Sequence, residues 1–234
     1  MEYTKLVAPT ITELFESKIQ SAILSGELKT GEKLPTEREL AEHFGISKSA
    51  VHLGLQNLKK AGFISIEPRQ GIYVADWAES GGLETLSALL HSNALKLEKS
   101  NVRSLINMRE ALEADAMIAL AGKHTEQNIK DLLDITGEIR KGTAVYRYDE
   151  LTELAFRFTH YIYYHSGNVF SSLILNSFKT FATSLWKQWI VATGPEKAAD
   201  LLEKVARCIE AGDGHAAIAI EHEYHLEFLN REYV

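Results

Sequence analysis

The sequence predicts a mainly α-helical protein, in which an N-terminal winged helix-turn-helix precedes a C-terminal all-α bundle of six or seven helices. Two observations lead to this fold class. Residues 35–62 carry two apolar helical stripes separated by a single glycine, Gly45. From Leu83 onward, apolar residues recur at helical spacing and the strand pattern does not return. A chain of 234 residues is long enough for two such domains.

The first two helices carry start signals of their own. Apolar residues recur at helical spacing over residues 10–25, and Thr10 is the expected N-cap. The next helix begins with a capping box, in which Thr36 is the N-cap and Glu39 its reciprocal partner. We therefore expect two well-defined helix starts before the turn at Gly45.

The third helix follows that turn directly. Gly45 lies where the chain needs a positive φ, and Ser47 is the expected N-cap of the new helix. Val51, Leu55 and Leu58 then form its apolar stripe. A helix-turn-helix places its second helix in the major groove of DNA, so this stretch predicts a DNA-binding protein.

A two-stranded hairpin, the wing, is expected next. Alternating and apolar runs lie on either side of residues 67–71, as in a hairpin. Arg69, Gln70 and Gly71 form its tip, where we expect contact with the minor groove or with phosphates. A solvated turn is the alternative.

Polar side chains at the start of the third helix are candidates for reading bases. Lys48 can donate to guanine or to phosphate, and Ser49 suits either. His52 reads a base or packs inside the domain. Arg38 contacts DNA or pairs with Glu42 on its own helix. The expected DNA-binding residues are Arg38, Ser47, Lys48, Ser49, His52, Arg69, Gln70 and Gly71.

The net charge of −7 is unevenly distributed. Residues 1–76 carry nine Lys or Arg and ten Asp or Glu, so most of the acidity lies in the remainder of the chain. Residues 47–71 carry four bases against the single acid Glu67. This local positive patch predicts a modest and strongly salt-dependent affinity for phosphates.

The domain plan is a DNA-binding domain at 1–76, a linker at 77–84 and a helical domain at 85–234. The expected helices lie near residues 83–91, 101–122, 126–140, 149–165, 169–192, 196–211 and 214–231. The lone Cys208 lies on an apolar helix face and fits a reducing compartment. Without a signal peptide or membrane span in the sequence, we expect a cytoplasmic protein with no membrane partner.

No enzyme motif is present in the sequence. It contains no P-loop, dinucleotide fingerprint or nucleophile elbow. We therefore expect no catalytic residues and no cofactor.

Residues 10–75 resemble the N-terminal domain of the GntR family of bacterial winged-helix regulators. The run G-x-L-x-x-G-x-x-L-P-[ST]-E-R-x-L-A, at 26–41, carries the resemblance. It implies that Arg38 contacts DNA. Where the family's third helix commonly has two arginines, Lys48 and His52 stand here. Because lysine does not replace the bidentate arginine fork, we expect an operator or an affinity that departs from the family's usual one.

The C-terminal half resembles the FadR subfamily of these regulators. The matching pieces are W-x-x-S-G-x-L-E-T-L at 77–86, the helix at 109–113, SGN at 166–168, LILN at 173–176 and AGD at 211–213. The resemblance implies a bundle that dimerises and binds a small effector in its core. It also implies a homodimer on a palindromic double-stranded DNA operator, acting as a ligand-responsive repressor.

Many members of this subfamily hold a metal ion through one Asp and three His. The corresponding positions here are Ala155, Thr159, Leu202 and His225. Because only His225 can ligate, we expect no metal site. The spacings of His160 with His165 and of His222 with His225 still leave open a metal-dependent sensor or metalloenzyme as the alternative.

The acyl-CoA-responsive regulator that gives the subfamily its name also lacks the metal ligands. The resemblance therefore implies a fatty acyl-CoA or a small organic acid among the candidate effectors. Aromatic residues at helical spacing around Trp186 would line an apolar pocket or simply form core. The expected effector-binding residues are Arg109, His160, Tyr164, Asn168, Asn176, Lys179, Trp186, Trp189 and His225. A DNA-architectural protein without an effector is a further alternative.

Overall fold

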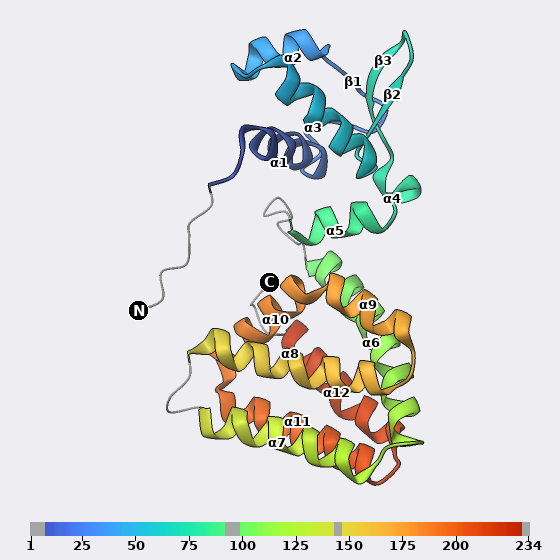
Figure 1. Ribbon diagram of the computed structural model, residues 1–234, viewed down its shortest axis with the longest axis vertical. Helices are drawn as coiled ribbons and strands as arrows, with labels where there is room; N and C mark the ends of the chain where they lie inside the picture. The colour runs from blue at the N-terminus through green and yellow to red at the C-terminus, as the bar shows by residue number, and fades with distance from the viewer. Residues whose placement is uncertain (1–7, 92–98, 143–146, 231–234) are drawn as a thin grey trace. The chain divides into compact units, whose positions relative to one another are not determined.

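The computed structural model describes residues 8–91, 99–142 and 147–230 (Figure 1). The chain divides into two compact units, Met1–Lys96 and Leu97–Val234. Within the described residues there are twelve helices and one three-stranded sheet. The predicted fold class is therefore confirmed.

Three helices form the body of the N-terminal unit: α1 (Ile11–Leu24), α2 (Glu37–Phe44) and α3 (Lys48–Lys60). Their starts are capped as the sequence predicts. Thr10 and Thr36 each form a capping box, and the Ser47 hydroxyl accepts the N–H of Ala50. Gly45 has φ 65°, which completes the left-handed turn between α2 and α3.

The sheet has the order β1-β3-β2, with both pairings antiparallel. Its strands are β1 (Lys33–Leu34), β2 (Ile64–Glu67) and β3 (Gly71–Val74). The β2–β3 hairpin is the predicted wing. The sequence did not reveal β1, because two residues are too short to show a period, although Leu34 is buried in the core.

The apolar stripes of α2 and α3 meet α1 in one core. It consists of Phe15, Ile19, Ile23, Leu34, Leu40, Ala41, Val51, Leu55, Leu58, Phe63, Ile64, Ile72 and Val74. Gly54 lets α1 and α3 approach closely, since a Cβ there would lie 2.6 Å from the Phe15 ring. Closely packed interiors of this kind are sensitive to single methyl groups.

Two further helices, α4 (Trp77–Ser80) and α5 (Leu83–His91), belong to the N-terminal unit. Trp77, Ala88 and Leu89 pack against its core. The sequence predicts a linker at residues 77–84 and a helical domain that begins at residue 85. The structure differs because Thr85 is buried and its hydroxyl accepts the N–H of Gly82. These contacts fix the start of α5 within the N-terminal unit.

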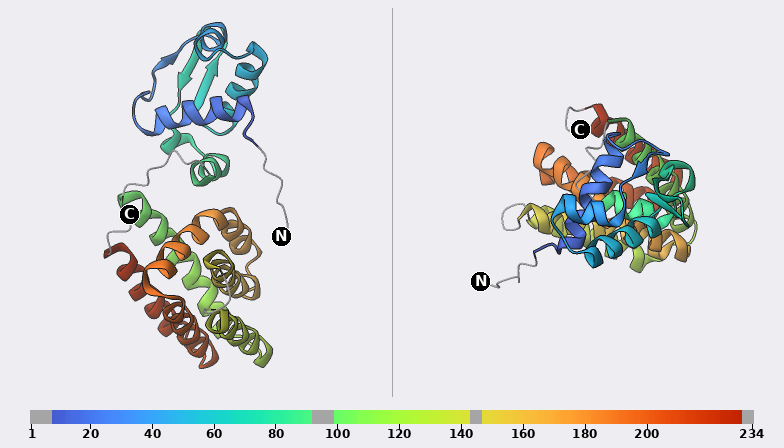
Figure 2. Two further views of the ribbon diagram at one scale, coloured as in Figure 1. Left: turned by 90° about the vertical axis from the view of Figure 1, so that its left-hand side faces the viewer. Right: turned by 90° about the horizontal axis from the view of Figure 1, so that it is seen from above.

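The C-terminal unit consists of seven helices in the part of the chain that the structure describes. They are α6 (Lys99–Ala121), α7 (Glu126–Gly142), α8 (Tyr148–His165), α9 (Val169–Ser177), α10 (Lys179–Thr193), α11 (Pro195–Glu210) and α12 (Gly214–Asn230). Helix α6 packs against α12 and α8, α7 against α11 and α8, and α10 against α8 (Figure 2). Gly214 starts α12 where a Cβ would lie 2.6 Å from the backbone of Ile118.

The helix predicted at 169–192 is two helices in the structure. The chain breaks at Phe178, whose N–H bonds to the carbonyl of Leu175 in a tighter turn and whose ring is buried. This break lets α9 and α10 lie against α8 separately. Among the described residues, no helix is long and apolar enough to cross a membrane.

Candidate DNA-binding face and effector cavity

The start of α3 presents a polar, exposed face. Lys48, Ser49 and His52 are all exposed, and the His52 side chain is 59% exposed. His52 therefore does not pack inside the domain. Leu53, which follows it, is 54% exposed although it is apolar. We did not predict a role for Leu53 from the sequence. It could have been noticed there as an apolar residue that lies outside the buried stripe of Val51, Leu55 and Leu58.

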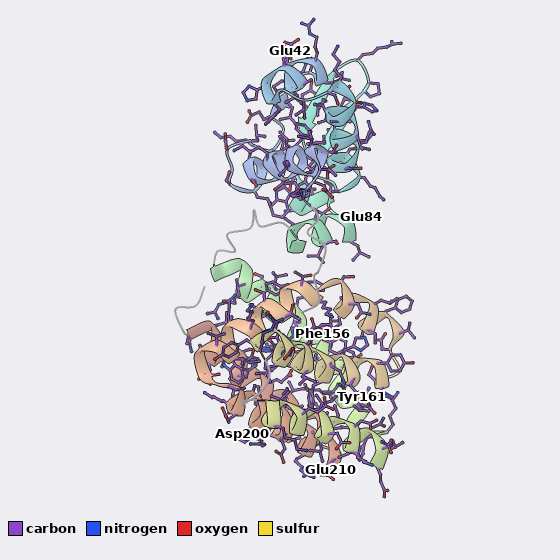
Figure 3. All side chains as sticks on the ribbon, turned by 60° about the vertical axis from the view of Figure 1, so that its left-hand side comes forward. Glu42, Glu84, Phe156, Tyr161, Asp200 and Glu210 are labelled. Atoms are coloured by element: carbon purple, nitrogen blue, oxygen red, sulfur yellow. The ribbon has the colours of Figure 1, made fainter. Side chains whose placement is uncertain are left out.

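Helix α2 supplies two side chains next to this face. Nδ1 of His52 lies 2.8 Å from Oε1 of Glu37, the first residue of α2. Arg38 lies 3.7 Å from Glu42 with both side chains 70% exposed. Such exposed pairs contribute about 0–1 kcal/mol, so the Glu42 contact leaves Arg38 able to reach a phosphate. Figure 3 shows Glu42 on the outer side of α2.

Two residues of the wing tip have a positive φ, which is uncommon for a side chain such as arginine and ordinary for glycine. Arg69 has φ 64° and Gly71 has φ 130°. A Cβ on Gly71 would lie 2.6 Å from Cε of Lys33, so this glycine also leaves room for the Lys33 side chain. Lys33, from β1, adds a basic group beside the wing that the sequence analysis did not name. Arg69 and Gln70 are both exposed.

The predicted effector-binding residues lie in several separate places in the bundle. His160, Asn176 and Lys179 line an open groove of about 710 Å³ on the outer side of α8. Acidic side chains share this groove, and Lys179 forms a 2.8 Å ion pair with Glu153. Phe156, labelled in Figure 3, lies in the same groove under the Lys179 ammonium group.

An enclosed cavity lies elsewhere, between α6, α8, α9 and α10. Of the predicted effector residues, only Arg109 lines it. The other lining residues are Leu105, Met108, Leu112, Tyr163, Ile174, Leu175, Phe178, Phe181 and Ala182. The space open to the centre of a water molecule is about 20 Å³, which is enough for about one water. The Tyr163 hydroxyl is buried and has no hydrogen-bond partner among the described residues.

Arg109 sits in a buried ionic cluster at the edge of this cavity. Its Nε donates to Oε1 of Glu113 at 2.5 Å, and both side chains are more than 90% buried. Burial lowers the pKa of Arg109, but the attraction of Glu113 and Glu221 more than offsets this and leaves it raised. Burial, followed by repulsion from Glu113, raises the pKa of Glu221 well above its ordinary value.

Trp186 and Trp189 belong to the core. Their rings lie with centroids 5.3 and 4.5 Å from the ring of Tyr224, and each tryptophan is 1% exposed. Their indole N–H groups have no partner among the described residues. Trp186 and Trp189 are therefore core residues, the second of the two possibilities that the sequence left open, and neither lines the enclosed cavity.

His225 is buried on α12. Its Nδ1 lies 2.8 Å from Oε1 of Glu110, which His222 also contacts at 3.1 Å. The hydrogen bond from His225 lowers the pKa of Glu110. Ala155 and Leu202, two positions of the family's metal ligands, are fully buried apolar residues. In the described ranges, no three His, Cys, Asp or Glu side chains are grouped as metal ligands.

Tyr164 and Asn168, two further predicted effector residues, line neither the groove nor the enclosed cavity. Tyr164 is 67% exposed and stacks on His160. Asn168 is the N-cap of α9, where its side-chain oxygen accepts the N–H of Ser171. Cys208 is half-buried, with a pKa raised by burial, so its thiol is not activated.

A winged helix-turn-helix with an exposed polar face at the start of α3, in a chain that also contains a helical bundle, defines the class of DNA-binding regulators. The family of bacterial regulatory proteins known as gntR matches residues 13–74, and the FCD domain family matches residues 104–227. The chain belongs to the GntR family, with an FCD domain as its C-terminal part. It is a transcription regulator of the FadR type and not an enzyme.

Curated relatives extend over most of the chain. The HTH-type transcriptional regulator LutR of Bacillus subtilis is 28% identical over 84% of this chain and 90% of its own length. The fatty acid metabolism regulator protein of Pasteurella multocida is 28% identical over 76% of this chain and 71% of its own length. The solved structure of Lar from Listeria monocytogenes has a TM-score of 0.63 at 15% identity, covers 96% of this chain and 97% of its own, and supports the fold.

Proposed function

We propose that this protein represses transcription as a homodimer on a palindromic operator, and that a small organic acid in the bundle cavity releases it. The DNA-binding residues are those of the α2–α3 face (Arg38, Ser47, Lys48, Ser49 and His52) and of the wing tip (Arg69, Gln70 and Gly71). Two heads of a symmetric dimer match two operator half-sites about one helical turn apart. Such a repressor works in the bacterial cytoplasm, where its operator is.

The observation that carries the effector proposal is the enclosed cavity with Arg109 and the unpartnered Tyr163 hydroxyl at its polar end. Eight apolar side chains form the remainder of its lining. Ligand sites are typically apolar with a few convergent polar groups. A guanidinium group and a free hydroxyl together suit a carboxylate.

The small volume favours a compact acid over a fatty acyl-CoA. An acyl chain would have to displace Met108, Phe178 and Phe181 from a space that now accepts about one water. The name of the Pasteurella relative, a fatty acid metabolism regulator, keeps the acyl-CoA as the second candidate. A metal ion is the third candidate on the sequence spacing of His222 and His225 alone, because the described residues contain no group of three metal-ligating side chains.

Release follows from differential affinity. An effector shifts the balance between two arrangements of the DNA-binding heads only by the difference in its affinity for them. An arrangement in which the heads no longer match the half-site spacing has a lower affinity for the operator. The effector must therefore bind that arrangement more tightly.

Two measurements on the full-length protein test this function. The first is a thermal-shift titration with small carboxylates, long-chain acyl-CoAs and divalent metals, because a ligand of the native state raises Tm by mass action. The second selects operator DNA from a random pool and measures its release by each ligand that binds. We expect a palindromic site, a dimer in sedimentation, and release by a small acid. A monomer that binds DNA without sequence preference would contradict the proposal.

A further inference from the structure

We infer that Leu53 is a specificity-determining residue, and that it contacts the C5-methyl group of a thymine in the major groove of the operator. The inference rests on the proposed function, because it concerns the face of α3 that is proposed to bind DNA. It adds an apolar contact to a set of DNA contacts that are otherwise hydrogen bonds and ion pairs. The protein then distinguishes a methylated pyrimidine from an unmethylated one at one position of each half-site.

The rotation of α3 about its own axis is fixed by contacts on two sides. Val51, Leu55 and Leu58 are fully buried in the core of the N-terminal unit. On the side of α3 that faces α1, the Asn57 amide donates to Oε1 of Glu16 at 2.7 Å. A helix turned about its axis would lose both sets of contacts. The outward face of α3 is therefore the one opposite the buried stripe.

Leu53 lies in the middle of this outward face. Successive residues of a helix are turned by about 100°, so residues three or four positions apart share a face. Ser49, Leu53 and Gln56 have this spacing, and all three are exposed. A single exposed leucine is ordinary on a protein surface. This one, 54% exposed between two polar side chains, lies on the face that a helix-turn-helix presents to the bases.

The Leu53 side chain leans toward the end of α3 that enters the groove. The Cα–Cβ bond of a helical residue is tilted toward the helix N-terminus, so the side chain covers the surface of the preceding turn. That turn carries Ser49, and the N-cap Ser47 comes two residues earlier. In a helix-turn-helix, the N-terminal residues of the second helix contact base edges. Leu53 therefore belongs to the segment that reads the sequence.

The thymine methyl group is the base feature that suits a leucine side chain. In the major groove every base pair presents hydrogen-bonding groups, and thymine alone adds an apolar group. A leucine placed against a donor or acceptor would displace its water without replacing the hydrogen bond, which is unfavourable. The neighbouring Ser49 and Gln56 can supply hydrogen bonds to adjacent base edges. Leu53 therefore favours thymine at the base that it faces.

The test uses the full-length protein and the operator selected from the random DNA pool. Each thymine of one half-site is replaced in turn by deoxyuridine, which lacks the methyl group and keeps the pairing with adenine. Fluorescence anisotropy measures Kd for each operator. We expect a position at which loss of the methyl group weakens binding about fourfold, which corresponds to about 0.8 kcal/mol, the value of one buried methyl-sized group.

Two leucine variants assign this methyl group to its contact. Leu53→Ala should bind the thymine and deoxyuridine operators equally well at that position. Leu14→Ala is the matched control and should keep the fourfold difference, because Leu14 is 53% exposed on α1, outside the α2–α3 face. Both side chains are exposed, so we expect both variants to fold, which circular dichroism checks.

A second series of operators needs no variant. The same thymine–adenine pair is replaced by cytosine–guanine and by 5-methylcytosine–guanine. The methyl group of 5-methylcytosine occupies the same place in the major groove as that of thymine. We expect the unmodified protein to bind the 5-methylcytosine operator about fourfold more tightly than the cytosine operator.

The outcomes separate this inference from the proposed function. A selected half-site without thymine, or one in which no methyl group affects Kd, overturns the inference and leaves the proposed function in place. A methyl effect that persists in Leu53→Ala, or equal binding of the two cytosine operators, also overturns it. The proposed function fails separately, if the protein is a monomer or if no ligand of the series releases the operator. Binding without any sequence preference contradicts both.

Discussion

Nδ1 of His52 lies 2.8 Å from Oε1 of Glu37, so the third helix of the DNA-binding unit is joined to the first residue of α2 by a side-chain pair. The pair turns Nε2 of the imidazole away from Glu37. Where Glu37 accepts the proton of Nδ1, Nε2 is an acceptor, which matches the amino groups of adenine or cytosine.

This relationship predicts a specificity contact. His52→Ala should weaken binding to the selected operator by about 1–3 kcal/mol and relax the preference at one base pair. Glu37→Gln should show part of the same loss, because the ring is then less firmly oriented. Fluorescence anisotropy with operators altered at single positions measures both variants. A uniform loss over all sequences would instead place His52 on a phosphate.

Lys48 offers a contrast to His52. Lys48→Ala should weaken binding to every sequence and reduce the salt slope of the affinity by about 1, if the ammonium group binds a phosphate. Lys18→Ala, an exposed lysine on α1, is the matched control and should change neither quantity. The slope is measured by anisotropy over a series of salt concentrations. An unchanged slope combined with a loss at one base pair would show that Lys48 reads a base.

The capping box of α2 predicts a dependence of stability on pH. Glu39 accepts hydrogen bonds from the N–H and the hydroxyl of Thr36, both at 2.8 Å, and these bonds lower its pKa from 4.5. A carboxyl group with a lowered pKa stabilises the folded state above its unfolded pKa. This contribution is lost as the pH falls through the folded value.

The variant Glu39→Gln should therefore reduce the loss of stability on acidification below about pH 4.5. Urea unfolding followed by circular dichroism, at neutral pH and in acid, measures the difference. Glu42→Gln is the control, because the partner of Glu42 among the described residues is the exposed Arg38, and this variant should leave the dependence unchanged. Equal effects of the two variants would mean that the capping box does not contribute.

Two adjacent glycines before α5 should respond differently to alanine. A Cβ on Gly81 would lie 2.3 Å from the carbonyl oxygen of Trp77 and 2.7 Å from Oγ1 of Thr85. On Gly82, the nearest atom would be Oε2 of Glu84 at 3.8 Å. Gly81→Ala should lower the free energy of unfolding by about 1–3 kcal/mol. Gly82→Ala should change it by no more than about 0.5 kcal/mol.

Hydrogen exchange of the α5 amides locates this effect, because the clash lies between α4 and Thr85. Gly82→Ala is also the suitable variant for testing whether this segment transmits the effector signal, since it stiffens the backbone without a clash. Unchanged release of the operator by effector would exclude Gly82 as a hinge.

Substitution of the buried Trp189 and of the exposed Phe170 should change the free energy of unfolding by very different amounts. Trp189→Ala should cost about 3–5 kcal/mol, because its side chain is 1% exposed against Tyr224. Phe170→Ala should cost within about 0.5 kcal/mol in a monomer, because that ring is 76% exposed. Chemical unfolding measures both variants. A large loss for Phe170→Ala that depends on protein concentration would instead show that Phe170 lies in a dimer interface.

The sequence by itself determined the local elements of this protein. Thr36 with Glu39, Gly45 and Ser47 specify their helix starts and turn through bonds within a few residues, so spacing alone predicted them. The stripe of Val51, Leu55 and Leu58 likewise predicted which face of α3 is buried. The polar residues left outside that stripe then predicted the reading face.

Only the tertiary structure decided where distant residues meet. His160, Arg109 and His225 were grouped by sequence in one effector site, yet they lie in an open groove, at an enclosed cavity and beside Glu110. Tyr163 could not be distinguished from its neighbours Tyr161 and Tyr164, because one residue along a helix turns a side chain by about 100°. Which of the three points inward depends on the packing of α6, α9 and α10 around α8 and not on local spacing.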